Sequence, residues 1–191
     1  MAWRPESLAV YLRIFFVRPK GALNAELTKA VDTTFMLCQF LFAVIPEFNQ
    51  SGLLPEGIHW ADMNEIERRY AKNEQRKRLL SGFKRAVDAL RTAGCSLVYL
   101  DGSFVTEKEL PDDYDACWET QGVTLKALDP VLLDFSNRRA AQKTKYFGEL
   151  FPAHLRAENC SPFKIFFQFF QVDKVTGEKK GIIGIKLPMI L

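Results

Sequence analysis

Two aspartates and a glycine–serine pair have the spacing in this chain most suited to chemistry. Asp113 and Asp115 stand two residues apart, and nine residues lie between them and Gly102-Ser103. Carboxylates at i and i+2 of a strand point to the same face, where both can hold a divalent cation against a phosphate. The glycine lets backbone approach a ligand, and free N–H groups and a hydroxyl suit phosphate oxygens. The pattern therefore indicates a phosphate and metal site.

Length and composition leave room for such a site in an ordinary globular protein. The 191 residues are enough for one domain with a sizeable core, or for one domain with an appendage. A formal charge of +3 permits a nucleotide or RNA partner without requiring one. The four cysteines are widely spaced, which argues against a zinc site and favours reduced thiols in a cytoplasmic protein. Neither His59 nor His154 adjoins a nucleophile, so both are predicted to be structural.

The first part of the chain differs from the rest. Two apolar runs, residues 7–17 and 35–45, are each shorter than the roughly 18 to 20 residues that span a bilayer. From Pro46 onward the sequence is a loop rich in glycine, proline and asparagine, which indicates a domain boundary. We therefore expect residues 1–44 to be an N-terminal extension, residues 45–191 to form the domain, and no segment to cross a membrane.

Around the opening motif the apolar pattern predicts a mixed α+β domain. Asp62 or Asn64 can cap a helix that reaches about Ala71, and Asn73 can cap a longer helix that ends before Gly94. Apolar residues at positions 79, 80, 83, 87 and 90 recur at helical spacing, so the long helix should pack on a sheet. The expected strands are 96–100, 114–118, 146–151 and 181–187, and the expected shorter helices are 125–135, 138–145 and the aromatic run after Pro162.

The aromatic run itself invites a second interpretation. Six apolar residues between 163 and 170, five of them phenylalanine, resemble a surface on which nucleic-acid bases stack. Such a surface needs interleaved basic residues, and the run holds only Lys164. The sequence therefore favours a core element, or a buried partner surface, over a stacking platform.

Taken together, the motif and the order of elements carry a family resemblance. Gly102-Ser103, nine residues and then Asp113-Tyr114-Asp115-Ala116 resembles the signature of the polymerase-β-type nucleotidyltransferase superfamily, in which a Gly-Ser pair precedes an acidic-apolar-acidic strand. Residues from about 45 to 191 also resemble a little-characterised bacterial family of minimal nucleotidyltransferase-like proteins. The segments that carry this second resemblance are Ile-Pro-Glu-Phe-Asn, Gly-Leu-Leu-Pro-Glu-Gly-Ile-His, Val-Tyr-Leu-Asp-Gly-Ser-Phe-Val-Thr, Leu-Leu-Asp-Phe-Ser-Asn, Glu-Leu-Phe-Pro-Ala and Phe-Phe-Gln-Val-Asp-Lys. Members of that family would begin near Val44, which suggests that residues 1–44 are not native.

The resemblance implies a fold and a set of roles. The fold would be a nucleotidyltransferase-like mixed sheet packed by helices. Asp113 and Asp115 would bind Mg²⁺ or Mn²⁺, and Gly102 and Ser103 would hold the triphosphate of a nucleotide such as ATP. The superfamily commonly adds a third carboxylate from a later strand, and Glu149 is the residue in the most suitable place.

The sequence assigns less definite roles to the other charged residues near the motif. Asp134 and Asp173 are weaker substitutes for Glu149, because the first falls in an expected helix and the second near a turn. Asp101 is expected to orient the loop beside it. Lys143 and Lys145 could meet nucleotide phosphates or could form an exposed helix end.

The resemblance implies a transferase as the leading function. It would move a nucleoside monophosphate from a nucleoside triphosphate to a hydroxyl of tRNA, a protein or a small molecule, within a bacterial toxin–antitoxin system by analogy with minimal relatives. The alternative is a catalytically degenerate domain that acts as a binding or regulatory module and masks a partner toxin. A structural protein anchored through its apolar N-terminus has less support.

Overall fold

The computed structural model describes residues 45–158 and 162–187. These residues fall within one compact unit, residues 43–191. The expected N-terminal extension, residues 1–44, lies outside the described residues. Within the described ranges, no helix is both long enough and apolar enough to cross a membrane.

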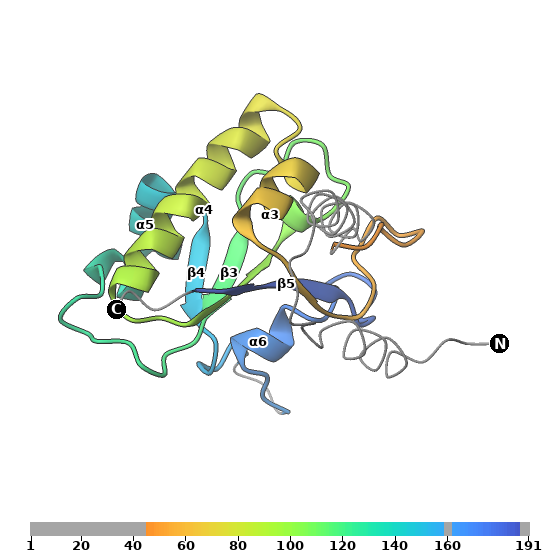
Figure 1. The fold of residues 1–191 in the computed structure, drawn as a ribbon. Helices are drawn as coiled ribbons and strands as arrows, with labels where there is room; N and C mark the ends of the chain where they lie inside the picture. The colour runs from red at the N-terminus through yellow and green to blue at the C-terminus, as the bar shows by residue number, and fades with distance from the viewer. Residues whose placement is uncertain (1–44, 159–161, 188–191) are drawn as a thin grey trace, which may run out of the picture. The chain divides into compact units, whose positions relative to one another are not determined.

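A five-stranded mixed sheet forms the centre of the domain, and Figure 1 shows helices on both of its faces. The strands are β1 (Gly57–Trp60), β2 (Leu97–Asp101), β3 (Asp115–Trp118), β4 (Glu149–Pro152) and β5 (Gly181–Lys186). Their order across the sheet is β1-β5-β2-β3-β4, in which β1 is parallel to β5, β3 is parallel to β4, and β2 is antiparallel to both of its neighbours. The expected mixed α+β architecture is confirmed.

Three helices cover one face of the sheet. They are α3 (Met63–Tyr70), α4 (Glu74–Thr92) and α5 (Ala140–Tyr146). As predicted, Asn73 caps α4, since its side chain accepts a hydrogen bond from the N–H of Arg76. Asp62 caps α3 in a reciprocal capping box with Glu65. Because both caps satisfy N–H groups that the helix cannot, each helix begins at a defined residue.

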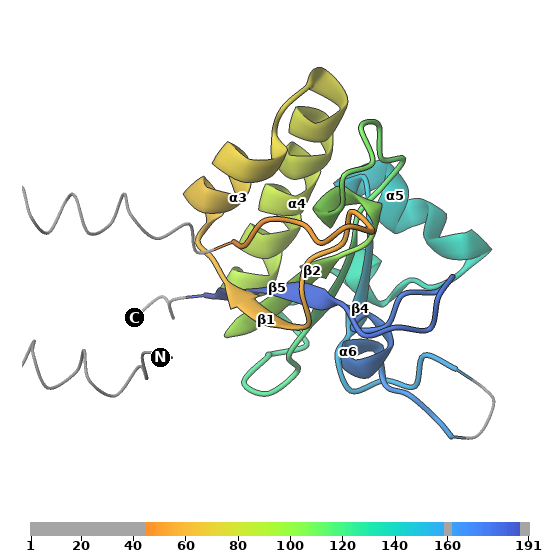
Figure 2. The same ribbon diagram turned by 90° about the vertical axis from the view of Figure 1, so that its right-hand side faces the viewer.

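Strand alternation divides the core into two clusters. Val98, Leu100, Ala116 and Leu150 pack toward α3, α4 and α5 in the larger cluster. Their neighbours along the strands belong to a smaller cluster on the opposite face, where α6 (Phe166–Phe169) lies (Figure 2). The members of the smaller cluster are Tyr99, Cys117, Phe151, Ala153, Phe170 and Ile182. The even-numbered and odd-numbered residues of β2 thus face different layers.

Local structure departs from the predictions in three places. The helix expected over 125–135 is wrong, since the segment consists of turns and one short 3₁₀ helix, Pro130–Leu133. Asp129 caps this 3₁₀ helix, and proline occupies its first turn. The strand expected from residue 146 begins at Glu149, because α5 runs to Tyr146 and ends in left-handed Phe147 (φ 63°). The short strand β1 was not predicted.

Candidate functional site

Strand register places three carboxylates side by side. Asp101 at the end of β2 pairs with Asp115 at the start of β3, and Asp115 pairs with Glu149 at the start of β4. Registered partners point to the same face of a sheet, so the three side chains share one face at one end. Asp113 lies two residues before Asp115, just outside the strand. The structure therefore brings together the predicted residues Asp113, Asp115 and Glu149.

Two basic side chains from the α5 region lie among these carboxylates. The Lys143 ammonium is 3.2 Å from Asp113 Oδ2 and 2.6 Å from Glu149 Oε1. Arg139 Nε is 2.5 Å from the other oxygen, Glu149 Oε2. These carboxylates raise the pKa of Lys143, chiefly through the hydrogen bond to Glu149. Glu149 is buried, with 7% of its surface exposed, and both of its oxygens are paired with cations.

The backbone that presents Arg139 is strained. Asn137, Arg138 and Arg139 have φ values of 46°, 54° and 60°, a left-handed region that residues with a Cβ rarely enter. Each such residue costs about 1 kcal/mol or more, and strain of this kind gathers where the surrounding structure requires one geometry. The helix expected to begin at Arg138 begins two residues later, at Ala140.

Asp115 is the carboxylate that lacks a partner. Within the described ranges, no hydrogen bond or ion pair reaches its side chain. Burial raises its pKa to about 7, Lys174 opposes the rise, and Asp101, Asp113 and Glu149 add to it through charge repulsion. A group that titrates near neutrality amid like charges is typical of functional sites.

Gly102 allows Asp115 to lie where it does. The residue has φ 82°, and a Cβ there would stand 2.7 Å from both the amide nitrogen and Oδ2 of Asp115. Ser103 follows in a short 3₁₀ helix, and its hydroxyl is 3.5 Å from the carbonyl oxygen of Asp113. The glycine is thus required both by its backbone conformation and by the close approach of β3.

A buried ion pair fixes the end of β2. Lys180, just before β5, contacts the carboxylate of Asp101, and the two residues are 9% and 4% exposed. Burial raises the pKa of Asp101, and the Lys180 charge opposes that shift. Asp101 was predicted to orient the loop beside it. No local sequence pattern predicts its pairing with Lys180, because 79 residues separate the partners.

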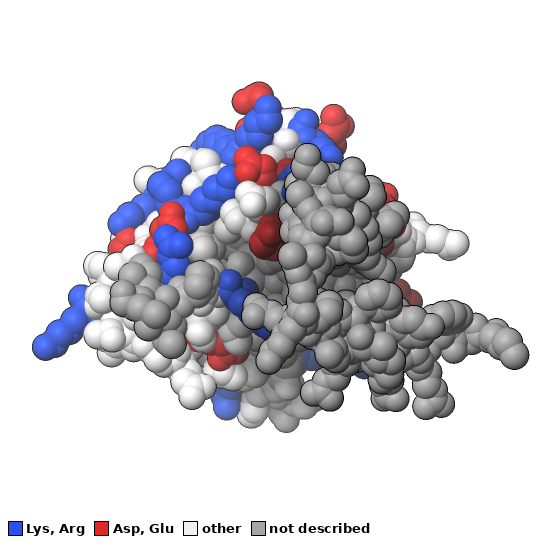
Figure 3. Space-filling view, viewed as in Figure 1, with Lys and Arg blue, Asp and Glu red and all other residues white. Residues whose placement is uncertain are grey.

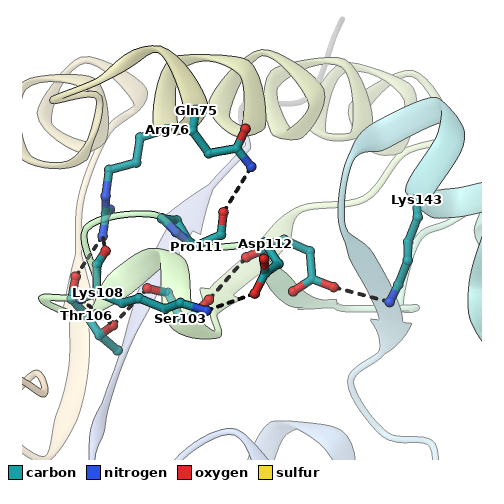
Figure 4. A network of polar contacts seen from close by, with 9 residues as sticks. Gln75, Arg76, Ser103, Thr106, Lys108, Pro111, Asp112 and Lys143 are labelled. Carbon is teal, nitrogen blue, oxygen red and sulfur yellow. Dashed lines mark hydrogen bonds and ion pairs between the residues drawn. The ribbon is translucent and has the colours of Figure 1, made fainter.

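Arg76 holds the nine-residue segment between the Gly-Ser pair and the aspartates (Figure 4). Its guanidinium donates to the carbonyl oxygens of Phe104 (2.7 Å), Thr106 (2.9 Å), Lys108 and Glu109 (3.2 Å). Burial lowers its pKa.

Neighbouring side chains of α4 complete this contact. Gln75 donates to the carbonyl oxygen of Pro111 (3.0 Å) and Asn73 to that of Glu109 (2.9 Å), so the start of α4 positions the loop. Arg76 was not among the residues predicted to serve the site. The sequence did contain a signal for the burial of Arg76, because residue 76 precedes Leu80 and Phe83 by four and seven positions and so lies on the apolar stripe of the helix.

The remaining candidates lie in other contacts. Asp134 accepts from Ser136 and Asp173 from Thr176, so each stabilises its own turn. Lys145 pairs with Asp129. In the described part of the chain none of these three residues pairs with a carboxylate of the site, and Glu149 is the third carboxylate that the strands bring beside Asp115.

The donor set agrees with a hard divalent cation at Asp113 and Asp115. Mg²⁺ is usually bound through one or two carboxylates, with substrate phosphates and water completing its shell, and these two residues supply such oxygens. The observation that fits a bound cation is the Asp115 carboxylate, which has no partner among the described residues and lies near other negative charges. Across residues 45–158 and 162–187, no group of three or more potential ligands stands close enough to hold a metal by itself. Glu149 does not share a ligand position with the two aspartates, because its oxygens contact Lys143 and Arg139 instead.

Comparison with known proteins places this arrangement in a family. Residues 46–186 match the model of a family of unknown function, DUF6932. The chain belongs to this family. The matched residues include all five strands and every charged side chain of the candidate site, so the site lies within the DUF6932 domain. No curated protein and no solved structure gives a significant match.

Proposed function

We propose that this DUF6932 domain is a metal-dependent nucleotidyltransferase of the polymerase-β type. The observation that supports the proposal is the register of β2, β3 and β4, which aligns Asp101, Asp115 and Glu149 beside the Gly102-Ser103 turn. A phosphate-binding turn next to grouped carboxylates is the combination that such a transferase needs. The nucleotidyltransferase-like topology and the toxin–antitoxin setting are parts of the same proposal.

In this proposal each residue of the site has one task. Asp113 and Asp115 hold the divalent cation, which supplies neutralisation of the charge on the nucleotide phosphates. The N–H groups and hydroxyl of the Gly102-Ser103 turn bind the triphosphate. Glu149 accepts the proton of the acceptor hydroxyl, whose oxygen then forms a bond to the α-phosphorus while the bond to pyrophosphate breaks.

The basic residues suit the same reaction. Lys143 contacts both Asp113 and Glu149, so it bridges the two ends of the site. Its ammonium compensates the negative charge of both carboxylates until a cation and a nucleotide bind there. Arg139 fixes the second oxygen of Glu149 and so orients its first oxygen.

The test is transfer of label from an α-labelled nucleoside triphosphate in the presence of Mg²⁺ or Mn²⁺. Asp113→Asn and Asp115→Asn should each reduce transfer by at least about a hundredfold, because each removes a metal ligand. Asp112→Asn is the matched control: it is the adjacent aspartate, it is exposed and pairs with Lys108, and its substitution should leave transfer unchanged. Equal transfer by all three variants would reject the assigned site.

One observation favours the alternative, a binding module that does not catalyse transfer. Both oxygens of Glu149 are engaged by Lys143 and Arg139, which is the arrangement expected if no base is needed. Titration of the protein with Mn²⁺, followed by electron paramagnetic resonance, separates the two functions. Mn²⁺ binding that depends on Asp115 without any label transfer, across a panel of acceptors, would support the binding module and its antitoxin-like role.

A further inference from the structure

Glu149 is held by two cations at the position where the proposed function needs a free carboxylate. The Lys143 ammonium is 2.6 Å from its Oε1, and Arg139 Nε is 2.5 Å from its Oε2. A general base must offer an unoccupied oxygen to the proton that it accepts. Glu149 can therefore act as a base only after at least one of these two contacts opens.

The carboxylate is the fixed member of this cluster. The N–H of Glu149 donates to the carbonyl oxygen of Tyr114 (2.9 Å), and the N–H of Leu150 donates to Oε1 of Gln142 (2.8 Å). Gln142 is fully buried, so β4 is held on one side by β3 and on the other by α5. Because the strand is held on both sides and the Glu149 side chain is buried, the contacts open most readily by movement of the cations.

The two cations are the movable members. The side chains of Lys143 and Arg139 are 42% and 31% exposed, so an anion can reach both from solvent. Arg139 Nε makes no hydrogen bond in the described part of the chain, so its contact with Glu149 is an ion pair without hydrogen-bond geometry. The left-handed backbone of Arg139 persists only where contacts impose it. Relaxation of this backbone would partly offset the loss of the contact with Glu149.

An anion bound at the Gly-Ser turn would lie close to Lys143. The Ser103 hydroxyl is 3.5 Å from the carbonyl oxygen of Asp113, and Asp113 Oδ2 is 3.2 Å from the Lys143 ammonium. Figure 4 shows the Lys143 side chain reaching from α5 toward the loop that carries Ser103. Lys143 in turn contacts Glu149. A row of phosphates that starts at the turn can therefore extend over the cations that hold the carboxylate.

We propose that Lys143 and Arg139 form a latch on Glu149 that a triphosphate opens. Without an anion, the two cations hold the buried carboxylate. When a triphosphate binds at the Gly-Ser turn, they move onto its oxygens and leave Glu149 free. The exchange is favourable because a triphosphate offers several charged oxygens to the same cations, whereas a carboxylate offers two. The latch rests on the proposed function, in which it makes the base available only when the nucleotide is in place.

Ion pairs on the helical face of the domain lack this asymmetry. Figure 3 shows basic and acidic side chains intermixed over α3 and α4. Glu67 pairs with Lys84 and is exposed. Asp88 pairs with Arg91 and is also exposed. A carboxylate in water stays hydrated when its cation leaves, so such an exchange changes little. At Glu149 the same exchange frees a buried carboxylate and changes what the site can do.

The test measures metal-free binding of inorganic triphosphate, in EDTA, by isothermal titration calorimetry. Glu149→Gln keeps the shape of the side chain but releases both cations, so it should strengthen binding at least about fivefold. Lys143→Gln and Arg139→Gln should each weaken binding at least about fivefold, because each removes a cation that receives the phosphates.

Combined variants distinguish a latch from simple repulsion. Glu149→Gln gains affinity by freeing the cations, so its gain should be at least about threefold smaller in the Lys143→Gln background. A carboxylate that repels the triphosphate through space would give the same gain in both backgrounds. A second readout is the Nε–H resonance of Arg139 in proton–nitrogen correlation spectra. Triphosphate should move this resonance, in the parent protein, toward its position in Glu149→Gln.

Matched controls separate the latch from general charge effects. Asp112→Asn removes one negative charge from the loop beside the site, where Asp112 is exposed and pairs with Lys108. Lys145→Gln removes one positive charge from α5, where Lys145 pairs with Asp129. Each should change triphosphate affinity by less than about twofold. Circular dichroism and thermal unfolding confirm that each variant is folded.

The outcomes separate the latch from the proposed function. The latch is overturned if Glu149→Gln does not raise triphosphate affinity, if its gain is equal with and without Lys143, or if neither the parent nor Glu149→Gln binds triphosphate. Label transfer by a protein that fails these comparisons overturns the latch and leaves the transferase standing. A latch that opens with triphosphate in a protein without transfer supports the inference and removes the transferase, leaving a binding module that responds to triphosphate.

Discussion

At the scale of single residues, the site is a balance of opposed charges in a partly buried place. Asp113 and Glu149 are held by Lys143, and Asp101 is held by Lys180, but the Asp115 carboxylate has no such partner in the described ranges. Its pKa is accordingly raised. Burial of a charge without a partner is costly, so the folded protein favours the protonated acid there.

The first prediction concerns the pH dependence of stability. The pKa of Asp115 rises from 3.8 to about 7 on folding, so the folded state binds more protons between these values and stability falls as pH rises through that window. Asp115→Asn removes this loss. Relative to the parent, its free energy of unfolding should be unchanged near pH 4 and higher by ~2–4 kcal/mol at pH 8, as measured by urea unfolding. A difference that does not vary with pH contradicts the shifted pKa.

The second prediction concerns Gly102. Because φ is 82° and an added Cβ would stand 2.7 Å from the β3 backbone, Gly102→Ala should lower the free energy of unfolding by at least about 2 kcal/mol. It should also weaken Mn²⁺ binding, because the added methyl group displaces Asp115. Gly177→Ala is the matched control: it shares a positive φ of 73° but has open space around it, so it should cost stability without changing Mn²⁺ binding. Equal losses of Mn²⁺ affinity in both variants would argue against the close approach as the cause.

At the scale of elements, α4 connects the core to the site. Its apolar stripe packs on the sheet, its first turn clamps the loop before Asp113 through Arg76, and its middle meets α5. The contact with α5 matters for function because α5 bears Lys143 and follows directly after Arg139. The spacing between the two helices therefore sets how the cations reach Glu149.

The third prediction tests that spacing. Alanine normally stabilises a helix relative to glycine by about 1 kcal/mol. At Gly82 a Cβ would stand 1.9 Å from the carbonyl oxygen of Tyr146, so Gly82→Ala should instead destabilise the protein by about 2–3 kcal/mol in thermal unfolding. Ser81→Ala, next to it on the exposed side of α4, should be neutral or stabilising. Equal melting temperatures for the two variants would show that α5 yields without cost.

At the scale of the whole domain, residues far apart in the chain complete the site. The end of β2, the start of β3, the start of β4 and the residue before β5 meet at one end of the sheet, since β2 is antiparallel to β3 and β5. The buried pair of Asp101 with Lys180 ties together two of these segments. Its removal should therefore affect both global stability and the geometry of the carboxylates.

The fourth prediction is a double-mutant cycle on this pair. Lys180→Met leaves the Asp101 charge buried without a partner, and we expect it to cost about 3–5 kcal/mol in denaturant unfolding. Adding Asp101→Asn should restore part of that loss, since no buried charge then remains. Strictly additive costs would show that the two residues do not interact. Lys179→Met serves as control, because its pairing with Glu56 is exposed and worth little.

The sequence by itself determined the features that local physics controls. Asn73 and the apolar stripe defined α4, the β-branched and aromatic run before Gly102 defined β2, and the spacing of Asp113 and Asp115 marked the site. Only the tertiary structure decided what these residues meet. The alignment of Glu149 with Asp115 depends on strand register, the Lys180 contact spans 79 residues, and the cation over the ring of Phe151 is Arg139, from another segment. Capping and periodicity act within a few residues and leave a trace in the sequence, whereas register and long-range charge pairing arise only when the core has packed.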